Sequence, residues 1–484
     1  MKKVLATVAA LGLVLGVTAN ALALDQPGRA SESEATTAPR VPEPTAPGVA
    51  LWSVAGQWVL AGALVSNGLG NAGDANVWGN QAVPELGLDL KEGTDAFWIR
   101  SFKILPVLQV NDKIAMKGEI RIEDRNVAGL DGKSAEGANG ALEDNGRNAD
   151  FKHVYMEWVS PWGKTRFGRT PAGAWAGGFM NTTGQGDRFM WWLNMLPENW
   201  GSLLFIQKIT ERDVASSASD LDSDGYYVDL SYKADFGKTI GAIWATRNGA
   251  SVDAGGDKLQ TYQARLYGNY NFNALNIEYE VNWNFGQSSQ LDANGNFQDD
   301  KGLGTAVSAG YQMQDWNFGG LFFYMSGDSD PSDGDKKNML TRAGTGHDWN
   351  PYQIMTGDYM GILNTDNPNR VPGSWNANSL LVLDDGFSSG VWSLGANVKF
   401  NMSPALQLTG ELGYFAANKT ISGINQDKEL GWEVGIGMGY KIMDNLTYNA
   451  HFSYLMTGDY FKAGDANLNT EDVYLLAHAL SMKF

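Results

Sequence analysis

Cysteine is absent from the 484 residues of this chain. The absence excludes a disulfide framework and any metal site that needs thiolate ligands, so hydrogen bonds and burial must stabilise the fold. Histidine is scarce as well, and His153, His347, His451 and His478 do not have the spacing of a metal site. We therefore predict that the protein is not an enzyme and needs no cofactor. A Ser–His pair assembled from separate strands is the alternative that sequence spacing leaves open.

A long apolar run is also missing from most of the chain. The stretch Val4–Val17 follows Lys2 and Lys3 and precedes Ala21-Leu22-Ala23, which is the pattern of a cleaved export signal. No later stretch offers the ~20 consecutive apolar residues that a spanning helix needs. We predict a signal peptide over 1–23, a disordered linker rich in Pro, Ala, Ser and Glu over 24–49, and one domain over 50–484.

Positive charge is in deficit. The chain has 36 Lys and Arg against 54 Asp and Glu, a formal net charge of −18, and loss of the two signal lysines lowers this to −20. A protein this acidic is not expected to bind nucleic acid. Glycine and the aromatic residues are plentiful, with 59 Gly, 17 Trp, 18 Tyr and 20 Phe. This composition favours a transmembrane barrel with aromatic residues toward lipid, although a soluble β-sandwich has a similar one.

The dominant pattern in the domain is alternation with a period of two. From Leu275 to Phe285, apolar residues at odd positions alternate with Asn or Glu at even positions. Such alternation gives a strand one apolar and one polar face, and no helical period fits it. The pattern recurs over 114–123, 226–233 and 406–414, and over 430–440, where Leu430 and Trp432 fall on the apolar face. Each segment has the ~9 to 11 residues that a tilted transmembrane strand requires.

Connections between these segments alternate between short and long. Short ones with turn-forming residues include 111–113, 234–237 and 442–445, whereas 126–150 and 327–389 are long. Placing a strand on each side of every connection gives about eighteen strands, with sixteen as the alternative count. No helical pattern is present to cover a sheet face, and only closure removes open edges from hydrocarbon. We predict an all-β fold, a single transmembrane antiparallel up-and-down β-barrel with long extracellular loops.

The last strand gives a further sign of the cellular location. Tyr474, Leu476, Leu480 and Met482 share one face with Phe484. This resembles the C-terminal pattern of Gram-negative outer-membrane barrels, which implies recognition of Phe484 by the barrel assembly machinery. We expect the protein in the outer membrane, exported with a cleaved signal peptide and surrounded by outer-membrane lipids and lipopolysaccharide.

The segment from about residue 50 onward resembles bacterial porins. Parts of it resemble more particularly the alginate-export family, namely Phe167-Gly168-Arg169 and the stretches YKIMDNLTYNAHFSYLMTGDYF and YLLAHALSMKF. The Gln that this family usually carries after Gly-Arg is Thr170 here. The resemblance implies a channel and leaves its cargo open.

Charged residues on the expected polar faces are the candidates for the pore wall. The hypothesis is that arginines opposite carboxylates create a transverse field at a constriction, and the alternative is that these charges only solvate and brace the wall. The candidates are Lys117, Glu119, Arg121, Glu123, Glu157, Arg169, Arg265, Glu278 and Glu280.

Two loop features complete the set of candidates. The 327–389 connection carries Trp349, Tyr352, Tyr359 and Trp375, and it either folds into the pore or forms an external lid or trimer contact. Two acidic clusters are candidates for a surface divalent cation, the first because its spacing is that of the first half of a calcium loop, with solvated loop charge as the alternative. These clusters consist of Asp220, Asp222 and Asp224, and of Asp328, Asp330, Asp333 and Asp335.

The leading functional prediction is a homotrimeric porin-type channel for diffusion of small hydrophilic solutes or ions. The alternatives are an outer-membrane exporter of an anionic polysaccharide and a non-conducting surface adhesin or structural barrel. Conductance in a planar bilayer distinguishes a channel from a non-conducting barrel.

Overall fold

The computed structural model describes the greater part of the predicted domain. The described residues are 51–66, 94–127, 149–171, 179, 185–212, 221–292, 294–330, 333–339, 351–356, 389–420, 427–462 and 472–484. The predicted signal peptide and linker lie outside these residues, as does His347. Within them, no helix has the length and apolarity needed to cross a membrane.

Eighteen strands form the wall, at the positions where the alternating segments predict them. They are β1 (Leu51–Ser66), β2 (Thr94–Gln109), β3 (Ile114–Val127), β4 (Ala149–Ser160), β5 (Gly163–Pro171), β6 (Gln185–Leu193), β7 (Trp200–Thr210), β8 (Ser223–Ala234), β9 (Gly237–Val252), β10 (Lys258–Phe272), β11 (Leu275–Leu291), β13 (Leu303–Met313), β14 (Trp316–Met325), β16 (Val391–Asn401), β17 (Leu406–Ala417), β18 (Glu429–Met443), β19 (Leu446–Thr457) and β20 (Val473–Lys483).

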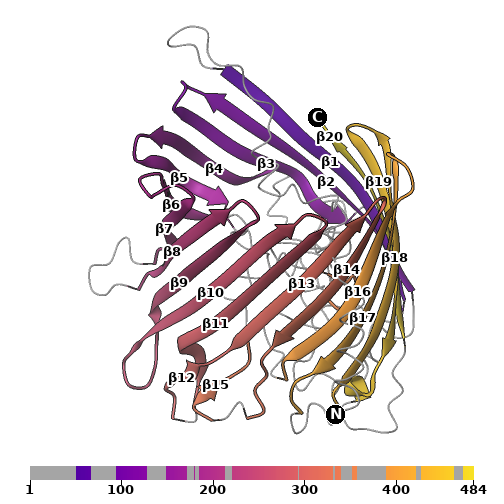
Figure 1. Cartoon of the computed structure of the whole chain (residues 1–484). Coiled ribbons are helices and arrows are strands. Elements are labelled where there is room, and N and C mark those ends of the chain that lie inside the picture. The colour runs from indigo at the N-terminus through magenta and orange to yellow at the C-terminus, as the bar shows by residue number, and fades with distance from the viewer. Residues whose placement is uncertain are drawn as a thin grey trace.

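The wall closes into a barrel. Each wall strand pairs antiparallel with its neighbours, and β1 pairs with both β2 and β20, so the first and last strands form a seam. Closure confirms the predicted fold and the count of eighteen. Two short strands, β12 (Phe297–Asp300) and β15 (Asp335–Lys336), pair in parallel outside the wall at the rim that carries the long connections (Figure 1). A 3-10 helix, η3 (Asp459–Lys462), follows β19.

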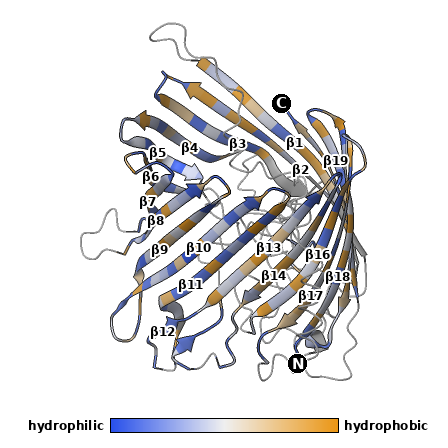
Figure 2. Cartoon of the chain, in the orientation of Figure 1, coloured by the Kyte–Doolittle hydropathy of each residue, from blue (hydrophilic) through white to orange (hydrophobic). Residues whose placement is uncertain are grey.

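The two faces of the wall have opposite character, as the alternation predicts. In β11, Trp283 is 53% exposed on the outer face, whereas its neighbours Asn282 and Asn284 are fully buried on the inner face. Figure 2 shows the same alternation of hydrophilic and hydrophobic residues along many strands. An apolar outer face is stable only against lipid, and a polar inner face indicates a lumen.

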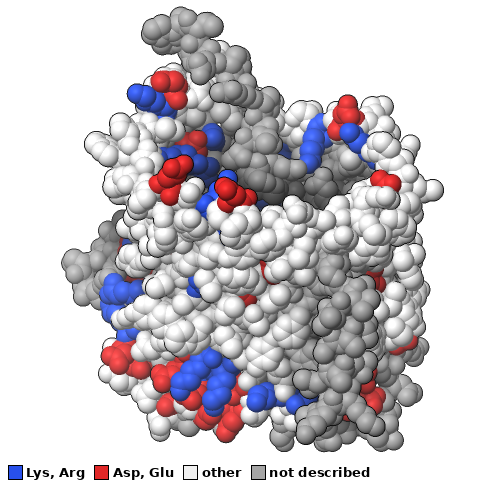
Figure 3. Space-filling view, viewed as in Figure 1, with Lys and Arg blue, Asp and Glu red and all other residues white. Residues whose placement is uncertain are grey.

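Aromatic and charged residues mark the two ends of the outer surface. Near the short turns, Tyr232, Phe236, Tyr270 and Phe272 line a surface pocket of about 380 Å³ among outward-facing rings. Figure 3 shows charged residues gathered toward the rims, with few on the belt between them on the face in view. This arrangement matches the apolar band and aromatic girdles of outer-membrane barrels, in which the short turns face the periplasm.

Phe484 completes the seam beside β1. Its amide donates to the carbonyl of Gly56 at 3.0 Å and its carbonyl accepts from the amide of Gly56 at 2.8 Å. The Phe484 ring stacks on Phe102 of β2, with ring centres 5.9 Å apart. A side chain at position 56 would collide with this ring, so the glycine provides the space into which Phe484 folds.

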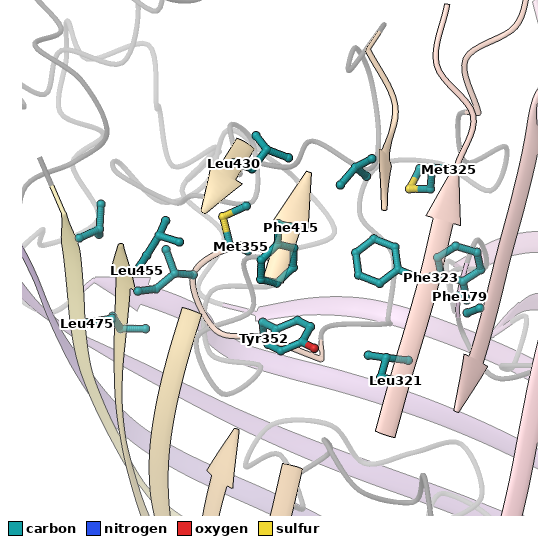
Figure 4. Close-up of a cluster of buried hydrophobic side chains, with 14 of the residues drawn as sticks. Phe179, Leu321, Phe323, Met325, Tyr352, Met355, Phe415, Leu430, Leu455 and Leu475 are labelled. Atoms are coloured by element: carbon teal, nitrogen blue, oxygen red, sulfur yellow. The ribbon is translucent and has the colours of Figure 1, made fainter. Parts of the chain in front are cut away.

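An apolar cluster lies inside the barrel, toward the rim with the long connections. Tyr352 from the 327–389 connection and Phe179 from the β5–β6 connection contribute to it together with inward residues of the wall (Figure 4). The rings form a row, with centres 6.1 Å apart for Phe179 and Phe323, 6.3 Å for Phe323 and Phe415, and 4.8 Å for Phe415 and Tyr352. Of the alternatives for the long loop, the described part, residues 351–356, therefore folds into the barrel. Trp349, Tyr359 and Trp375 lie outside the described residues.

Candidate pore wall

A first group of inward charges lies near the short-turn end of β3 to β5. The Nζ of Lys117 is 2.8 Å from Oε1 of Glu157, and the Nε of Arg166 donates to Oε2 of the same carboxylate at 2.9 Å. We call these three residues the lower charge cluster. The guanidinium of Arg166 also lies 5.0 Å from the ring centres of both Tyr155 and Trp192. Ion pairs and cation–π contacts together hold this arginine in a fixed orientation.

A second group lies farther from the short turns, on β2 to β4. Arg121 donates through Nε to Oε1 of Glu119, and Nδ1 of His153 is 3.8 Å from the other oxygen of Glu119. Lys103 of β2 is in register with Arg121, so it adds a second cation directly across from it. We call Lys103, Glu119, Arg121 and His153 the upper charge cluster. In both clusters cations outnumber carboxylates, so each cluster carries a net positive charge.

The register distinguishes two arginines of β5. Arg166 pairs with Glu157 and is buried. Arg169 pairs with Val154, which is 44% exposed on the outer face, and its Nε donates to the carbonyl of Lys152 at 3.1 Å. The inward position assigned to Arg169 from the sequence therefore belongs to Arg166. Strict alternation from Phe167, which is also outward, would have indicated this. The side chain of Glu123 lies outside the described residues.

The remaining charged candidates lie together on β10 and β11. Arg265 is buried beside Gln263, to which its Nε donates at 2.5 Å, and Glu280 occupies the diagonal position across the strand pair. Glu278 accepts from Nδ2 of Asn269 at 3.1 Å. With the amides Asn276, Asn282 and Asn284, β11 presents a ladder of oxygens to the interior.

Inward carboxylates also occur on β17 and β18, and sequence reasoning did not single them out as site residues. Glu411 of β17 and Glu433 of β18 are buried, and neither lies near the charge clusters in sequence. In the closed ring β17 is the fifteenth wall strand and β6 the sixth, so they are half a turn apart. The cation-rich wall of β2 to β6 therefore has Glu411 across the ring from its last two strands, β5 and β6.

A Ser–His pair does occur, but its geometry is not that of a catalytic relay. Nε2 of His451 lies 3.0 Å from Oγ of Ser453 and 3.3 Å from Oε1 of Glu411. A relay needs the carboxylate on the opposite ring nitrogen, where it would orient the imidazole. The sequence also contains G-F-S-S-G at 386–390, the spacing of a nucleophile elbow. That motif requires a strand–turn–helix, whereas the described Ser389 leads into β16.

The two acidic clusters of the loops bind lysines and backbone amides. Asp222 and Asp224 contact Nζ of Lys208 at 2.6 and 3.0 Å, while Asp220 lies outside the described residues. In the second cluster, Oδ2 of Asp333 is 2.5 Å from Nζ of Lys337, which holds the pKa of that carboxyl below its usual range. Asp328 accepts from the amides of Asp330 and Lys337, and Asp335 pairs with Lys301. Among the described residues, no three His, Asp or Glu side chains converge as a metal site would need.

Residues 213–476 match the model of the porin subfamily, a span of more than half of the chain. The chain belongs to this family. The porin is therefore an outer-membrane channel and not an enzyme, and its outer face contacts membrane lipids. No curated protein matches it significantly in sequence.

Solved structures share the fold of this porin. OccK1 (OpdK) of Pseudomonas aeruginosa superposes with a TM-score of 0.50 at 10% identity, over 89% of this chain and 98% of that one. OccK8 (OprE) of the same species gives 0.50 at 9% identity, with the same coverage. At such low identity the likeness concerns the fold alone.

Replacing Glu157 by glutamine is expected to make the porin more selective for anions. The change removes the one carboxylate that Lys117 and Arg166 share, so both cations lose their charged partner near the short-turn end. We expect the anion-to-cation permeability ratio to rise several-fold in low salt and less in 1 M salt, where the Debye length falls to ~3 Å. Reversal potentials across a salt gradient measure the change. An unchanged ratio would mean that ions do not pass the lower charge cluster.

Proposed function

We propose that this porin is a passive diffusion channel for small hydrophilic solutes and ions. Solutes pass along the cation-rich wall of β2 to β6 and opposite the inserted 351–356 segment. The observation that supports this most strongly is the pair of charge clusters, which place Arg121 and Arg166 inside a closed barrel that also carries the inward carboxylates Glu280 of β11 and Glu411 of β17. Opposed charges across a narrow lumen create a transverse field that orients dipolar solutes and sets ion preference.

The interior favours selective passage over a wide, unselective pore. The Phe179–Tyr352 row occupies part of the cross-section on the side of β14 to β18, so the polar path is confined toward β2 to β11. Cations outnumber carboxylates along β2 to β5, so a solute that carries a carboxylate or phosphate gains most from this path. We infer that anionic solutes permeate faster than cationic ones of equal size.

Channel activity is tested with the purified porin in planar lipid bilayers. We expect stepwise current increases as single channels insert, and a reversal potential of the sign that indicates anion preference in a salt gradient. The heat-denatured protein serves as the control for leak caused by detergent. An absence of steps from folded protein would contradict the proposal.

A second candidate is a barrel with a plugged lumen, acting as a surface adhesin or structural protein. The observation that favours it is the apolar cluster, since inserted residues such as Ile354 and Met355 are fully buried inside the barrel. The bilayer measurement separates the two candidates, because a plugged barrel inserts without conducting.

Export of an anionic polysaccharide is a third candidate, supported by the excess of cations along β2 to β5. A polymer threading the lumen would block the current of small ions for as long as it occupies the pore. Adding an alginate oligosaccharide to one side of the bilayer tests this candidate. Resolved current blocks would favour export, and an unaffected current would favour small solutes.

A further inference from the structure

The inserted segment of the long loop is attached to the barrel wall through one carboxylate. The amides of Gln353 and Ile354 donate to Oε1 of Glu433 at 2.9 Å each, and the amide of Met355 donates to Oε2 at 2.8 Å. All four residues are at most 1% exposed. Successive N–H groups that point the same way form a concave nest, in which a single carboxyl group accepts several hydrogen bonds at once.

The segment also has hydrogen bonds of its own that hold its shape. Oγ1 of Thr356 accepts from the amide of Tyr352 at 3.0 Å and donates to the Tyr352 carbonyl at 2.6 Å. These two bonds close a turn over residues 352–356, which directs the three amides between them toward one point. A preformed turn loses less conformational entropy on docking than a flexible loop does.

The wall is shaped to receive the segment. Gly395 and Gly413 face each other across β16 and β17, and the Tyr352 ring lies over both. A Cβ at position 413 would lie 2.5 Å from Cε1 of Tyr352, and one at position 395 would collide with its hydroxyl. The ring also packs edge-on against Phe415, at 4.8 Å between centres (Figure 4). The two glycines, which have no side chains, thus leave a notch in the wall beside the Glu433 carboxylate.

We propose that Glu433 is the positioning residue that holds segment 351–356 inside the barrel and so sets the width of the solute path. The nest fixes the backbone of the segment, and the glycine notch fixes its orientation through Tyr352. This role rests on the proposed channel function, since a width matters only where solutes pass.

The contact of Glu433 with segment 351–356, which we call the anchor, is tested with variants on both sides. Glu433→Gln replaces one of the two acceptor oxygens by a donor that faces an amide, and Ile354→Pro removes one donor without altering the wall. Glu429→Gln is the matched control, because it removes an exposed carboxylate from the same strand, away from the nest. Heat-modifiable migration on gels identifies the variants whose barrel has folded.

Two readouts separate the anchor from the channel function. We expect amide exchange at positions 353 and 355 to accelerate by at least about tenfold in both variants, since each loses a buried hydrogen bond. Position 354 is expected to show the same acceleration in Glu433→Gln and has no amide hydrogen to follow in Ile354→Pro. Single-channel conductance is expected to rise about twofold in both variants, and Glu429→Gln is expected to match the wild type in both measurements.

Each other outcome overturns a defined statement. Unchanged exchange in both variants would show that Glu433 does not hold the segment. Faster exchange with unchanged conductance would show that the segment does not set the width of the path. A wild-type protein without conductance would overturn the proposed channel, while the exchange experiment would still decide the anchor.

Discussion

Arg166→Glu is expected to shift the permeability ratio of this porin toward cations by roughly tenfold, equivalent to ~1.4 kcal/mol. The substitution places a second carboxylate against Glu157 and leaves Lys117 as the only cation of the lower charge cluster. Unit charges 4 Å apart interact by ~4 kcal/mol at an effective dielectric of 20, and screening by salt reduces the effect on a passing ion. Reversal potentials at several salt concentrations measure the shift.

Arg169→Glu is the matched control for this prediction. It makes the same change of charge three residues along β5, on the face that carries Val154. We expect it to leave the permeability ratio near the wild-type value. An equal shift in both variants would contradict the register of β5, and no shift in either would exclude the lower charge cluster from the ion path.

Gly431→Ala is expected to lower the free energy of unfolding of the barrel by ~3 kcal/mol. Gly431 has φ +126°, a backbone conformation that L side chains rarely adopt, and a Cβ there would collide with the carbonyl oxygen of Met456. The strand pairing shifts at this point, so the substitution would also disturb the bulge between β17 and β18. Urea unfolding of the protein in lipid vesicles measures the loss.

Gly320→Ala in β14 is the control, because no atom lies within 4 Å of its added Cβ and its φ is ordinary. We expect a change below ~0.5 kcal/mol there. If both alanine variants were equally stable, the positive φ of Gly431 would not be a requirement of the fold.

Most of the wall could be predicted from sequence because the alternation of apolar and polar residues within each strand indicates which face points outward. In β11 every second residue from Leu275 to Phe285 is apolar, and the strand begins at Leu275 as the pattern indicates. The bulge at the start of β18 is different. Alternation places Leu430 on the outer face with Trp432, whereas the bulge turns Leu430 inward, where it is fully buried in the apolar cluster. A bulge adds one residue to a strand and so reverses the direction of the side chains on one side of it. The hydrophobic pattern alone does not show where this happens.

The candidate pore wall was only partly predictable. Lys117, Glu119 and Arg121 follow from the alternation of β3. On β5, however, Arg169 was expected to point inward, whereas the register places Arg166 there. Glu433 stands between Trp432 and Val434, so its inward direction can be deduced from sequence. Its partners cannot, because the amides it binds lie 78 to 80 positions away in a loop without periodicity.

The seam between β1 and β20 has a consequence for the order of folding. The side chains of Gln57 and Ser481, which bond across it, are 424 positions apart in the chain. Contacts of such long range form late and slowly, and until they form both edge strands present unpaired backbone groups that invite aggregation. The barrel therefore cannot close strand by strand during export. One edge of β1 must remain unpaired until β20 is available, and other proteins or a partly formed sheet must protect that edge in the meantime.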